Sequence, residues 1–273
     1  MTNSSIKDSL KFASIDIGSN AMRLLFCRVI EDKDSPKFIK ESLFRMPLRL
    51  GHDAFTDGVI SEENSMKLID TIRAFQLMIK AYDPIAFRSC ATAALRTALN
   101  GKKLVDEINA KVNVDLEIIS GNEEARIIMA NHIEDHLDPK KNYLYVDVGG
   151  GSTEISFISN RQKVSSKSFP IGSVRLLENQ VTENDWADME KWINKNMSKH
   201  KGQFKAIGSG GNINKIFSMS QLNRKSEIDI STIQSVLDKI KPLSVQNRII
   251  QLGLRPDRAD VILHAGKIYE SIM

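Results

Sequence analysis

The sequence has few of the residues that secreted or membrane-embedded proteins depend on. It contains two cysteines, Cys27 and Cys90, and both lie in apolar stretches that are typical of strands. We interpret them as buried, reduced thiols rather than as a disulfide or a catalytic thiolate. No apolar run approaches the roughly 20 residues of a membrane span, and residues 1–11 are polar where a signal peptide has an apolar segment. We therefore expect a cytoplasmic protein that does not enter a membrane.

Aromatic residues are also scarce, at 6% of the chain, beside 41% hydrophobic residues overall. This balance is ordinary for a soluble protein. The length of 273 residues allows two domains, because a domain usually has about 100–200 residues. The formal net charge of +4 is mild. It suits a protein that handles small polyanions, and we expect no nucleic-acid partner.

Several common catalytic motifs are missing from the sequence. There is no GxSxG elbow, GxxxxGK[ST] loop, GxGxxG fingerprint, Cys/His cluster or Ser-His-Asp arrangement. His132 and His136 have helical i, i+4 spacing, but Glu134 stands in the wrong place for an HExxH zinc motif. We interpret this pair as part of a solvated helix face.

Two short segments carry the strongest signal in the chain. Asp16 and Asp147 each close an apolar strand and lie 131 positions apart (147 − 16), and each runs into a glycine turn that opens a second strand. The first turn consists of Gly18, Ser19 and Asn20, and the second of Gly149, Gly150, Gly151, Ser152 and Thr153. Glu154 follows the second turn directly.

Such a turn can bind phosphate, because glycine lets consecutive backbone N–H groups converge on one anion. The serine, threonine and asparagine side chains add donors at the same place. An aspartate beside the turn would repel the phosphate unless a cation lay between them, so the pair indicates Mg²⁺ or another divalent cation. One copy alone is also typical of an ordinary hairpin. Two copies favour a phosphoryl-transfer enzyme.

The order of predicted elements repeats in the two halves. In the first half we predict strands over 12–17, 21–30, 38–50, 85–90 and 116–119 and helices over 61–82, 93–111 and 123–137. In the second half we predict strands over 143–148, 153–159, 163–169 and 204–207 and helices over 184–197, 212–218, 231–253 and 257–273. This order predicts an α/β protein with two ribonuclease-H-like domains, 1–126 and 127–273, which face a central cleft as in actin-like ATPases.

Other candidate residues lie at predicted strand ends. Glu123 and Glu124 open a helix, where one carboxylate could accept a proton from an attacking water or only favour the helix dipole. Arg96 follows a strand and suits phosphate, because guanidinium binds it bidentately, although a surface arginine is an equal alternative. Arg23 is a weaker candidate. A further phosphate or nucleotide could bind where a strand leads into a helix through Gly208, Ser209, Gly210 and Gly211.

Together these motifs resemble the exopolyphosphatase / guanosine pentaphosphate phosphohydrolase (Ppx/GppA) family. The similarity lies in the segments 15–20, 91–96, 119–126 and 146–154, which include the strings SGNEEAR and DVGGGSTE. Weaker similarity covers 170–176, 208–211 and 258–262. The segments appear in family order and span nearly the whole chain.

The resemblance implies hydrolysis of a terminal phosphoanhydride bond, from inorganic polyphosphate or, as the nearest alternative, from guanosine pentaphosphate. It also implies that Glu124 activates water and that Asp147 and Glu154 bind the divalent cation. Longer family members carry further C-terminal helical domains beyond the two-domain core, and a dimer can be built on those domains. Whether this chain forms a homodimer is therefore left open by the resemblance. An actin-like kinase or a non-catalytic sensor of alarmone or polyphosphate are alternatives of other classes. The SGNEEAR string disfavours the kinase, and three intact carboxylates disfavour the sensor.

Overall fold

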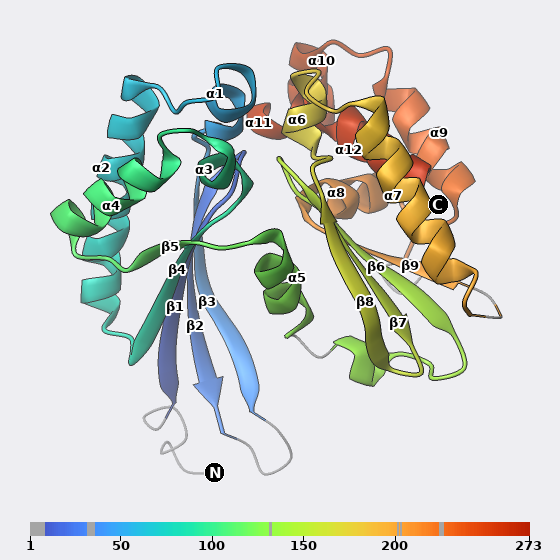
Figure 1. Cartoon of the computed structure of the whole chain (residues 1–273), viewed down its shortest axis with the longest axis horizontal. Coiled ribbons are helices and arrows are strands. Elements are labelled where there is room, and N and C mark those ends of the chain that lie inside the picture. The colour runs from blue at the N-terminus through green and yellow to red at the C-terminus, as the bar shows by residue number, and fades with distance from the viewer. Residues whose placement is uncertain (1–8, 32–35, 131–132, 201, 203, 224–226) are drawn as a thin grey trace. The chain divides into compact units, whose positions relative to one another are not determined.

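The computed structural model describes residues 9–31, 36–130, 133–200, 202, 204–223 and 227–273. The chain divides into two compact units, Met1–Ile119 and Ser120–Met273, which we call the first and the second unit. Each unit has its own sheet with helices packed against it (Figure 1). Among the described residues, no helix is both long enough and apolar enough to cross a membrane.

The first unit is built on a sheet that has, in the described residues, five strands in the order β3-β2-β1-β4-β5. The strands are β1 (Leu10–Ile17), β2 (Met22–Ile30), β3 (Lys37–Met46), β4 (Ala86–Ala91) and β5 (Leu116–Ile118). The first three form an antiparallel meander, and β4 and β5 run parallel to β1. The carboxyl ends of β1, β4 and β5 therefore meet at one end of the sheet, where open α/β sheets usually bind ligands.

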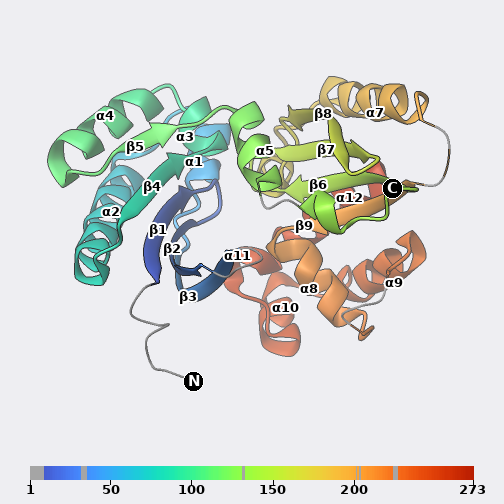
Figure 2. The same ribbon diagram turned by 90° about the horizontal axis from the view of Figure 1, so that it is seen from below.

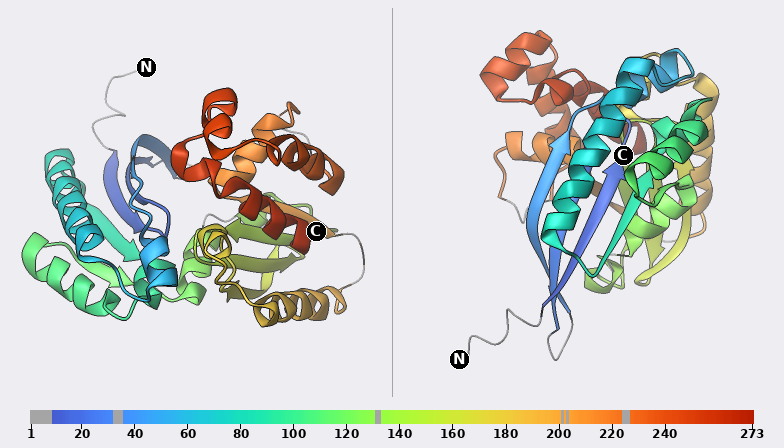
Figure 3. Two further views of the ribbon diagram at one scale, coloured as in Figure 1. Left: turned by 90° about the horizontal axis from the view of Figure 1, so that it is seen from above. Right: turned by 90° about the vertical axis from the view of Figure 1, so that its left-hand side faces the viewer.

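Helices cover one face of this sheet. The first unit contains α1 (Leu50–Thr56), α2 (Glu62–Tyr82), α3 (Ala93–Thr97) and α4 (Gly101–Val112), and α2 and α4 lie along the same face (Figure 3). On β1, Ala13, Ile15 and Ile17 are buried and alternate with less buried residues, as expected of a strand with one covered face. α2 starts where the sequence predicts, because the side chain of Ser61 accepts a hydrogen bond from the backbone of Asn64.

The second unit repeats this plan. Its described sheet has four strands in the order β8-β7-β6-β9, namely β6 (Asn142–Val148), β7 (Thr153–Ser159), β8 (Gln162–Phe169) and β9 (Phe204–Ser209). β6, β7 and β8 form an antiparallel meander, and β9 runs parallel to β6. The helices are α5 (Gly121–Met129), the 3-10 helix η1 (Ile133–His136), α6 (Ser173–Leu177), α7 (Glu183–Met197), α8 (Gly211–Met219), α9 (Ile230–Ile240), α10 (Val245–Leu252), α11 (Pro256–Ala259) and α12 (Ile262–Ile272) (Figure 2).

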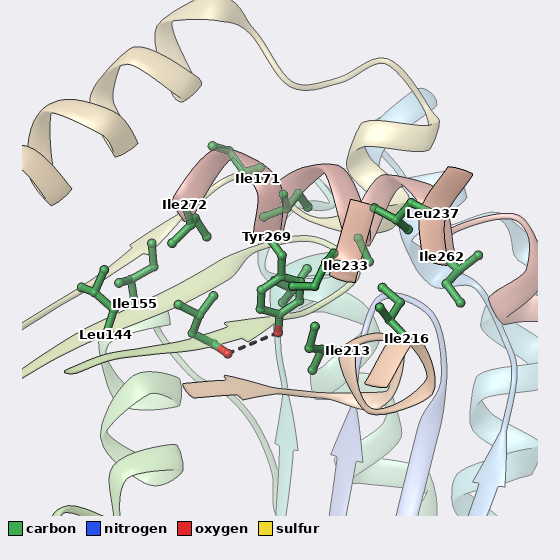
Figure 4. Packing of buried hydrophobic residues seen from close by; sticks show 14 of the residues in the cluster. Leu144, Ile155, Ile171, Ile213, Ile216, Ile233, Leu237, Ile262, Tyr269 and Ile272 are labelled. Atoms are coloured by element: carbon green, nitrogen blue, oxygen red, sulfur yellow. Dashed lines mark hydrogen bonds between the residues drawn. The ribbon is translucent and has the colours of Figure 1, made fainter. Parts of the chain in front are cut away.

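The main core of the second unit lies between its sheet and α12. Leu144 and Ile155 of the sheet belong to a cluster that also contains Tyr269 and Ile272 of α12 (Figure 4). The other face of the sheet carries a smaller cluster, which joins Tyr143 and Ile158 to Met129 of α5. The sheet is therefore covered on both faces, and all seven residues of β7 are buried.

Both units place their strands in the same order, with the first strand of the meander between the second and the fourth strand of the unit. This is the ribonuclease-H-like arrangement that the sequence predicts. The α/β fold with two such units, as in actin-like ATPases, is thereby confirmed.

Some predicted elements differ from the structure. The helix predicted over 93–111 is two helices, because Asn100 between them exchanges two hydrogen bonds with the backbone of Ile60. The helix predicted over 231–253 also divides, since Ser244 caps a new helix after Pro242. The strand predicted over 38–50 ends at Met46, and α1 follows.

The region around the predicted domain boundary also differs. The helix predicted over 123–137 is shorter in the structure, where α5 ends at Met129 with Ala130 as its C-cap. His136 lies in η1, whereas His132 is outside the described residues, so the shared helix face of these two histidines stays a prediction. The boundary predicted after Arg126 falls inside α5, which packs against β7 and β8 and belongs to the second unit.

Tyr269 connects the core to the strand ends of the second unit. Its hydroxyl donates to the carbonyl of Ser209 at 2.7 Å. The hydroxyl also lies 3.3 Å from the carbonyl of Val146, the contact that the dashed line at Tyr269 marks in Figure 4. Burial, followed by the nearby charge of Asp147, raises the pKa of Tyr269 far above its usual value. The hydroxyl therefore stays protonated and acts as a donor at any physiological pH.

We expect Tyr269→Phe to lower the free energy of unfolding by about 1–3 kcal/mol, because the buried hydrogen bond from its hydroxyl to the carbonyl of Ser209 is lost. Urea unfolding measures this change. Tyr145→Phe is the matched control, since no hydrogen bond joins the Tyr145 hydroxyl to the described residues, and it should change stability by less than about 0.5 kcal/mol. Equal effects of the two substitutions would contradict the role given to the Tyr269 hydroxyl.

Candidate active site

Asp147 and Glu154 lie side by side at the end of the second unit's sheet. They are paired directly across β6 and β7, and directly opposed residues point to the same face of a sheet. Asp147 is also the register partner of Ser209 on β9. The hairpin that joins β6 to β7 therefore brings two carboxylates together at the root of the glycine turn.

Each of these carboxylates is held by a serine. Ser209 Oγ donates to Asp147 Oδ1 at 2.8 Å, and Ser168 Oγ, from β8, donates to Glu154 Oε1 at 2.7 Å. Glu154 is only 3% exposed, and a buried carboxylate is stable only with such partners or with a cation. Sequence reasoning missed Ser168, because its contact depends on the register of β7 with β8.

The donor set fits a magnesium ion. Mg²⁺ prefers oxygen ligands and usually takes one or two protein carboxylates together with water and substrate phosphates. Asp147 and Glu154 supply such a pair. Within the part of the chain that the structure describes, no group of three or more Asp, Glu, His or Cys side chains could hold a metal ion.

The carbonyl groups of the glycine turn accept hydrogen bonds from a single neighbouring segment, residues 173–175. The carbonyl of Gly149 accepts from the backbone N–H of Ser173 at 3.0 Å, and that of Gly150 accepts from Val174 and Arg175 at 2.8 and 3.0 Å. The carbonyl of Gly151 accepts from the side chain of Arg175 at 3.0 Å. Three consecutive carbonyls of the turn thus point toward the segment that begins α6.

This arrangement fixes the direction of the amides. In a trans peptide the N–H of one residue points away from the carbonyl of the residue before it. The N–H groups of Gly150, Gly151 and Ser152 therefore point away from α6, and among the described residues none of the three donates to a protein acceptor. Convergent backbone N–H groups of this kind form an anion-binding concavity.

The hydroxyl of Thr153 has a different place from the one predicted. Thr153 is fully buried, and its Oγ1 donates to the carbonyl of Ile171 at 2.5 Å. Its side chain holds the turn from the inner side and does not point toward a ligand. Of the predicted phosphate-binding groups in this turn, the three backbone amides are the ones that the fold presents.

The second glycine cluster lies beside Asp147. β9 ends at Ser209, Gly210 takes a positive φ of 105°, and α8 begins at Gly211. A Cβ atom on Gly210 would lie 3.2 Å from Asp147 Oδ1, so glycine is needed for this close approach. The structure therefore places Ser209 and Gly210 against Asp147, where β9 leads into α8.

Glu123 and Glu124 have different surroundings on α5. Ser120 caps the helix by accepting from the N–H of Glu123. The carboxylate of Glu123 forms two hydrogen bonds with Arg126, at 2.7 and 2.8 Å, on the exposed side. Both glutamates are half-buried, and their helix packs against β7 and β8, the strands of Glu154 and Ser168. The pairing of Glu123 with Arg126 favours Glu124 over Glu123 for chemistry.

The turn of the first unit is built in a similar way. The carbonyl of Ser19 accepts from the N–H of Gly51 at 2.7 Å, and the carbonyl of Asn20 accepts from Arg49 at 3.1 Å. Gly18 closes the turn through its N–H to the carbonyl of Ala21. Here too a segment that follows the third strand of the meander holds the carbonyls of the turn. Gly51 was not among the predicted site residues.

Charged residues near this turn form local contacts. Arg23 Nη1 lies 2.5 Å from Asp16 Oδ2, across β1 and β2, and both side chains are about half exposed. Arg96 Nη1 donates to the carbonyl of Ile119 at 2.6 Å. The N–H of Thr92 bonds the carbonyl of Ile17. The ends of β1, β4 and β5 are thus tied together, and Asp16 and Arg96 both lie at that end of the sheet.

The two cysteines take no part in either cluster of functional residues. Cys27 and Cys90 are free and half-buried. Burial raises the pKa of the Cys27 thiol above its usual value, and burial raises the pKa of Cys90 to about 11. Both are therefore thiols rather than thiolates at neutral pH, and they are less buried than the sequence predicts.

Known proteins similar to this chain were found by sequence and by structure. Residues 30–273 match the sequence model of the Ppx/GppA phosphatase family. A bifunctional 3-dehydroquinate synthase/phosphatase of Fusobacterium nucleatum is 30% identical over 298 residues, which cover 98% of this chain and 44% of that protein. The chain thus spans less than half the length of this relative.

Two solved structures show the same fold. An exopolyphosphatase from Cytophaga hutchinsonii superposes with a TM-score of 0.77 at 22% identity, over 96% of this chain and 90% of that one. The Aquifex aeolicus member of the Ppx/GppA family gives a TM-score of 0.72 at 23% identity, over 97% of this chain and 90% of that one. The family match extends over most of the chain and includes the carboxylate pair and the glycine turn beside it. The chain therefore belongs to the Ppx/GppA phosphatase family.

Proposed function

We propose that the protein is an exopolyphosphatase, which releases the terminal phosphate of inorganic polyphosphate by attack of water with the help of a divalent cation. The observation that carries this proposal is the turn of the second unit. It presents the N–H groups of Gly150, Gly151 and Ser152 beside the carboxylates of Asp147 and Glu154. A phosphate bound by the amides and a cation bound by the carboxylates would be immediate neighbours.

The reaction places few demands on covalent chemistry. The transition state of phosphoryl transfer is loose, so catalysis consists mainly of positioning and of stabilising negative charge. In our proposal the turn amides bind the terminal phosphate, and Asp147 and Glu154 hold Mg²⁺, which when bound would neutralise phosphate charge. Glu124 accepts the proton of the attacking water. Its half-buried position on α5, against the strands of Glu154 and Ser168, supports this role.

The first unit has candidate phosphate contacts of its own. Asp16 and its turn repeat the pattern of Asp147 and its turn, and Arg23 and Arg96 provide guanidinium groups, which never lose their charge near neutral pH.

Guanosine pentaphosphate is the alternative substrate. It carries the same kind of terminal phosphoanhydride, so the residues named above would act on it in the same way. We place polyphosphate first, because the similar Cytophaga hutchinsonii protein is an exopolyphosphatase. A sensor without catalytic activity is disfavoured, because it has no need of Glu124 together with the carboxylate pair.

Phosphate release from four substrates tests the proposal. Long-chain polyphosphate, short polyphosphate, guanosine pentaphosphate and ATP are compared under matched conditions with Mg²⁺. We expect the highest kcat/KM for polyphosphate and activity at background after EDTA treatment, restored by added Mg²⁺. Full activity in EDTA would contradict a cation at the carboxylate pair, and a preference for guanosine pentaphosphate would select the alternative substrate.

Substitutions at the carboxylate pair locate the cation. We expect Asp147→Asn and Glu154→Gln to lower kcat/KM by about 10²-fold or more, because several kcal/mol of charge stabilisation depend on the cation. Asp188→Asn is the matched control. Asp188 pairs with Lys167 on the surface of the same unit, and an exposed ion pair contributes little. Circular dichroism checks that all three variants fold.

Comparison of two neighbouring glutamates tests the choice of base. We expect Glu124→Gln to lower kcat by about 10²–10⁴-fold with little change in substrate affinity, the usual contribution of a general base. Glu123→Gln disrupts the pair with Arg126, and it should lower kcat much less. Equal losses, or a larger loss at Glu123, would show that the base is assigned to the wrong residue.

A further inference from the structure

The segment 171–175 forms a support behind the glycine turn of the second unit. It follows β8 and begins α6, which lies beyond the end of the sheet where the turn is (Figure 1). The carbonyl of Ile171 accepts from Thr153, and Ser173 donates to the carbonyl of Gly149 through both its N–H and its Oγ. The segment therefore contacts the turn at both of its ends.

The approach of this segment requires a glycine. A Cβ atom on Gly172 would lie 2.4 Å from the carbonyl oxygen of Gly150 and 2.5 Å from its carbonyl carbon. No side chain fits at that distance, so the two backbones pack directly on each other. The peptide units of the turn are thus fixed against a second piece of backbone rather than against flexible side chains.

Arg175 is the residue of this segment that holds two peptide units of the turn. Its backbone N–H donates to the carbonyl of Gly150, and its Nε donates to the carbonyl of Gly151, each at 3.0 Å. These carbonyls belong to the peptides whose N–H groups come from Gly151 and Ser152. Since each peptide is planar, the guanidinium that fixes the carbonyl of Gly151 also fixes the direction of the Ser152 amide.

We infer that Arg175 is a positioning residue for the phosphate-binding turn. Its side chain does not touch the phosphate but keeps the peptide between Gly151 and Ser152 from rotating, so that the Ser152 amide stays aimed at the phosphate. This inference rests on the proposed function of the turn. A guanidinium is suited to the task, because it is always charged and its hydrogen bonds to a carbonyl are charge-assisted.

A purely structural role for Arg175 would have a different signature. Val174, its neighbour, is fully buried in the second unit, and α6 packs against α12, so packing is provided by other residues. Arg175 itself is only half-buried. Loss of its side chain should therefore affect the turn more than the stability of the unit.

The test compares three variants of the full chain. Arg175→Met keeps the length and apolar stem of the side chain and removes its donors, whereas Arg175→Lys keeps a charged donor. Arg161→Met is the matched control, because Arg161 also donates its Nε to a backbone carbonyl, that of Leu137 at 2.6 Å, but from the loop between β7 and β8. Kinetics with polyphosphate and Mg²⁺ are combined with backbone ¹⁵N order parameters of residues 149–152.

We expect Arg175→Met to raise KM by about tenfold with a smaller change in kcat, since one charge-assisted hydrogen bond behind the binding turn is lost. The order parameters of Gly151 and Ser152 should fall from about 0.85 toward values below about 0.6. Arg175→Lys should restore most of both properties, and Arg161→Met should change neither.

Several results would overturn the inference. One is a wild-type KM and unchanged order parameters in Arg175→Met, and another is an equal effect of Arg161→Met. If Arg175→Met does not fold, Arg175→Lys decides, because a folded Lys variant with a mobile turn would also contradict the role of a charged donor. If the wild-type protein releases no phosphate from any substrate, the proposed function fails. The order parameters then still show whether Arg175 holds the turn.

Discussion

The hydrogen bonds that occupy the carbonyl groups of the glycine turn are the constraint on which the candidate site depends. A turn of glycines has many accessible conformations, and free rotation of its peptides would scatter its N–H groups. In the second unit, donors from residues 173–175 bind three consecutive carbonyls. Planar peptides convert that anchoring into a common direction for three amides. The side of the turn that we propose binds phosphate thus lies opposite to the contacts that fix its peptides.

The ribonuclease-H-like fold provides these contacts twice. In each unit the third strand of the meander ends near the turn between the first two, and the chain then begins a short helix, α1 or α6. Gly51 and Gly172 lie in these connections, and at both positions a Cβ atom would approach the turn more closely than 3 Å. Two turns with similar supports therefore follow from one topology. The carboxylates of Asp16 and Asp147 lie at the ends of the first strands, beside those turns.

The parts of the site that the sequence predicts are those that are close together in the chain. Asp147, the glycines and Glu154 lie within eight consecutive positions, so the hairpin alone brings them together. The strands were predicted well for the same reason, since their alternation is local. Arg175 and Ser168 were not predicted as site residues, because their contacts reach back 24 and 14 residues and depend on strand register. The sequence predicts that Thr153 binds phosphate, because a hydroxyl in such a turn can point toward a ligand or toward the protein interior. The hydrogen bond to the carbonyl of Ile171, 18 residues away in the chain, directs it to the interior.

A crystal structure with Mg²⁺ and imidodiphosphate, a non-hydrolysable phosphoanhydride, tests the central claim most directly. The account predicts a phosphate whose oxygens lie about 2.7–3.2 Å from the N–H nitrogens of Gly150, Gly151 and Ser152, with the cation bound by Asp147 and Glu154. A phosphate bound by side chains elsewhere, with these three amides facing only water, would contradict it.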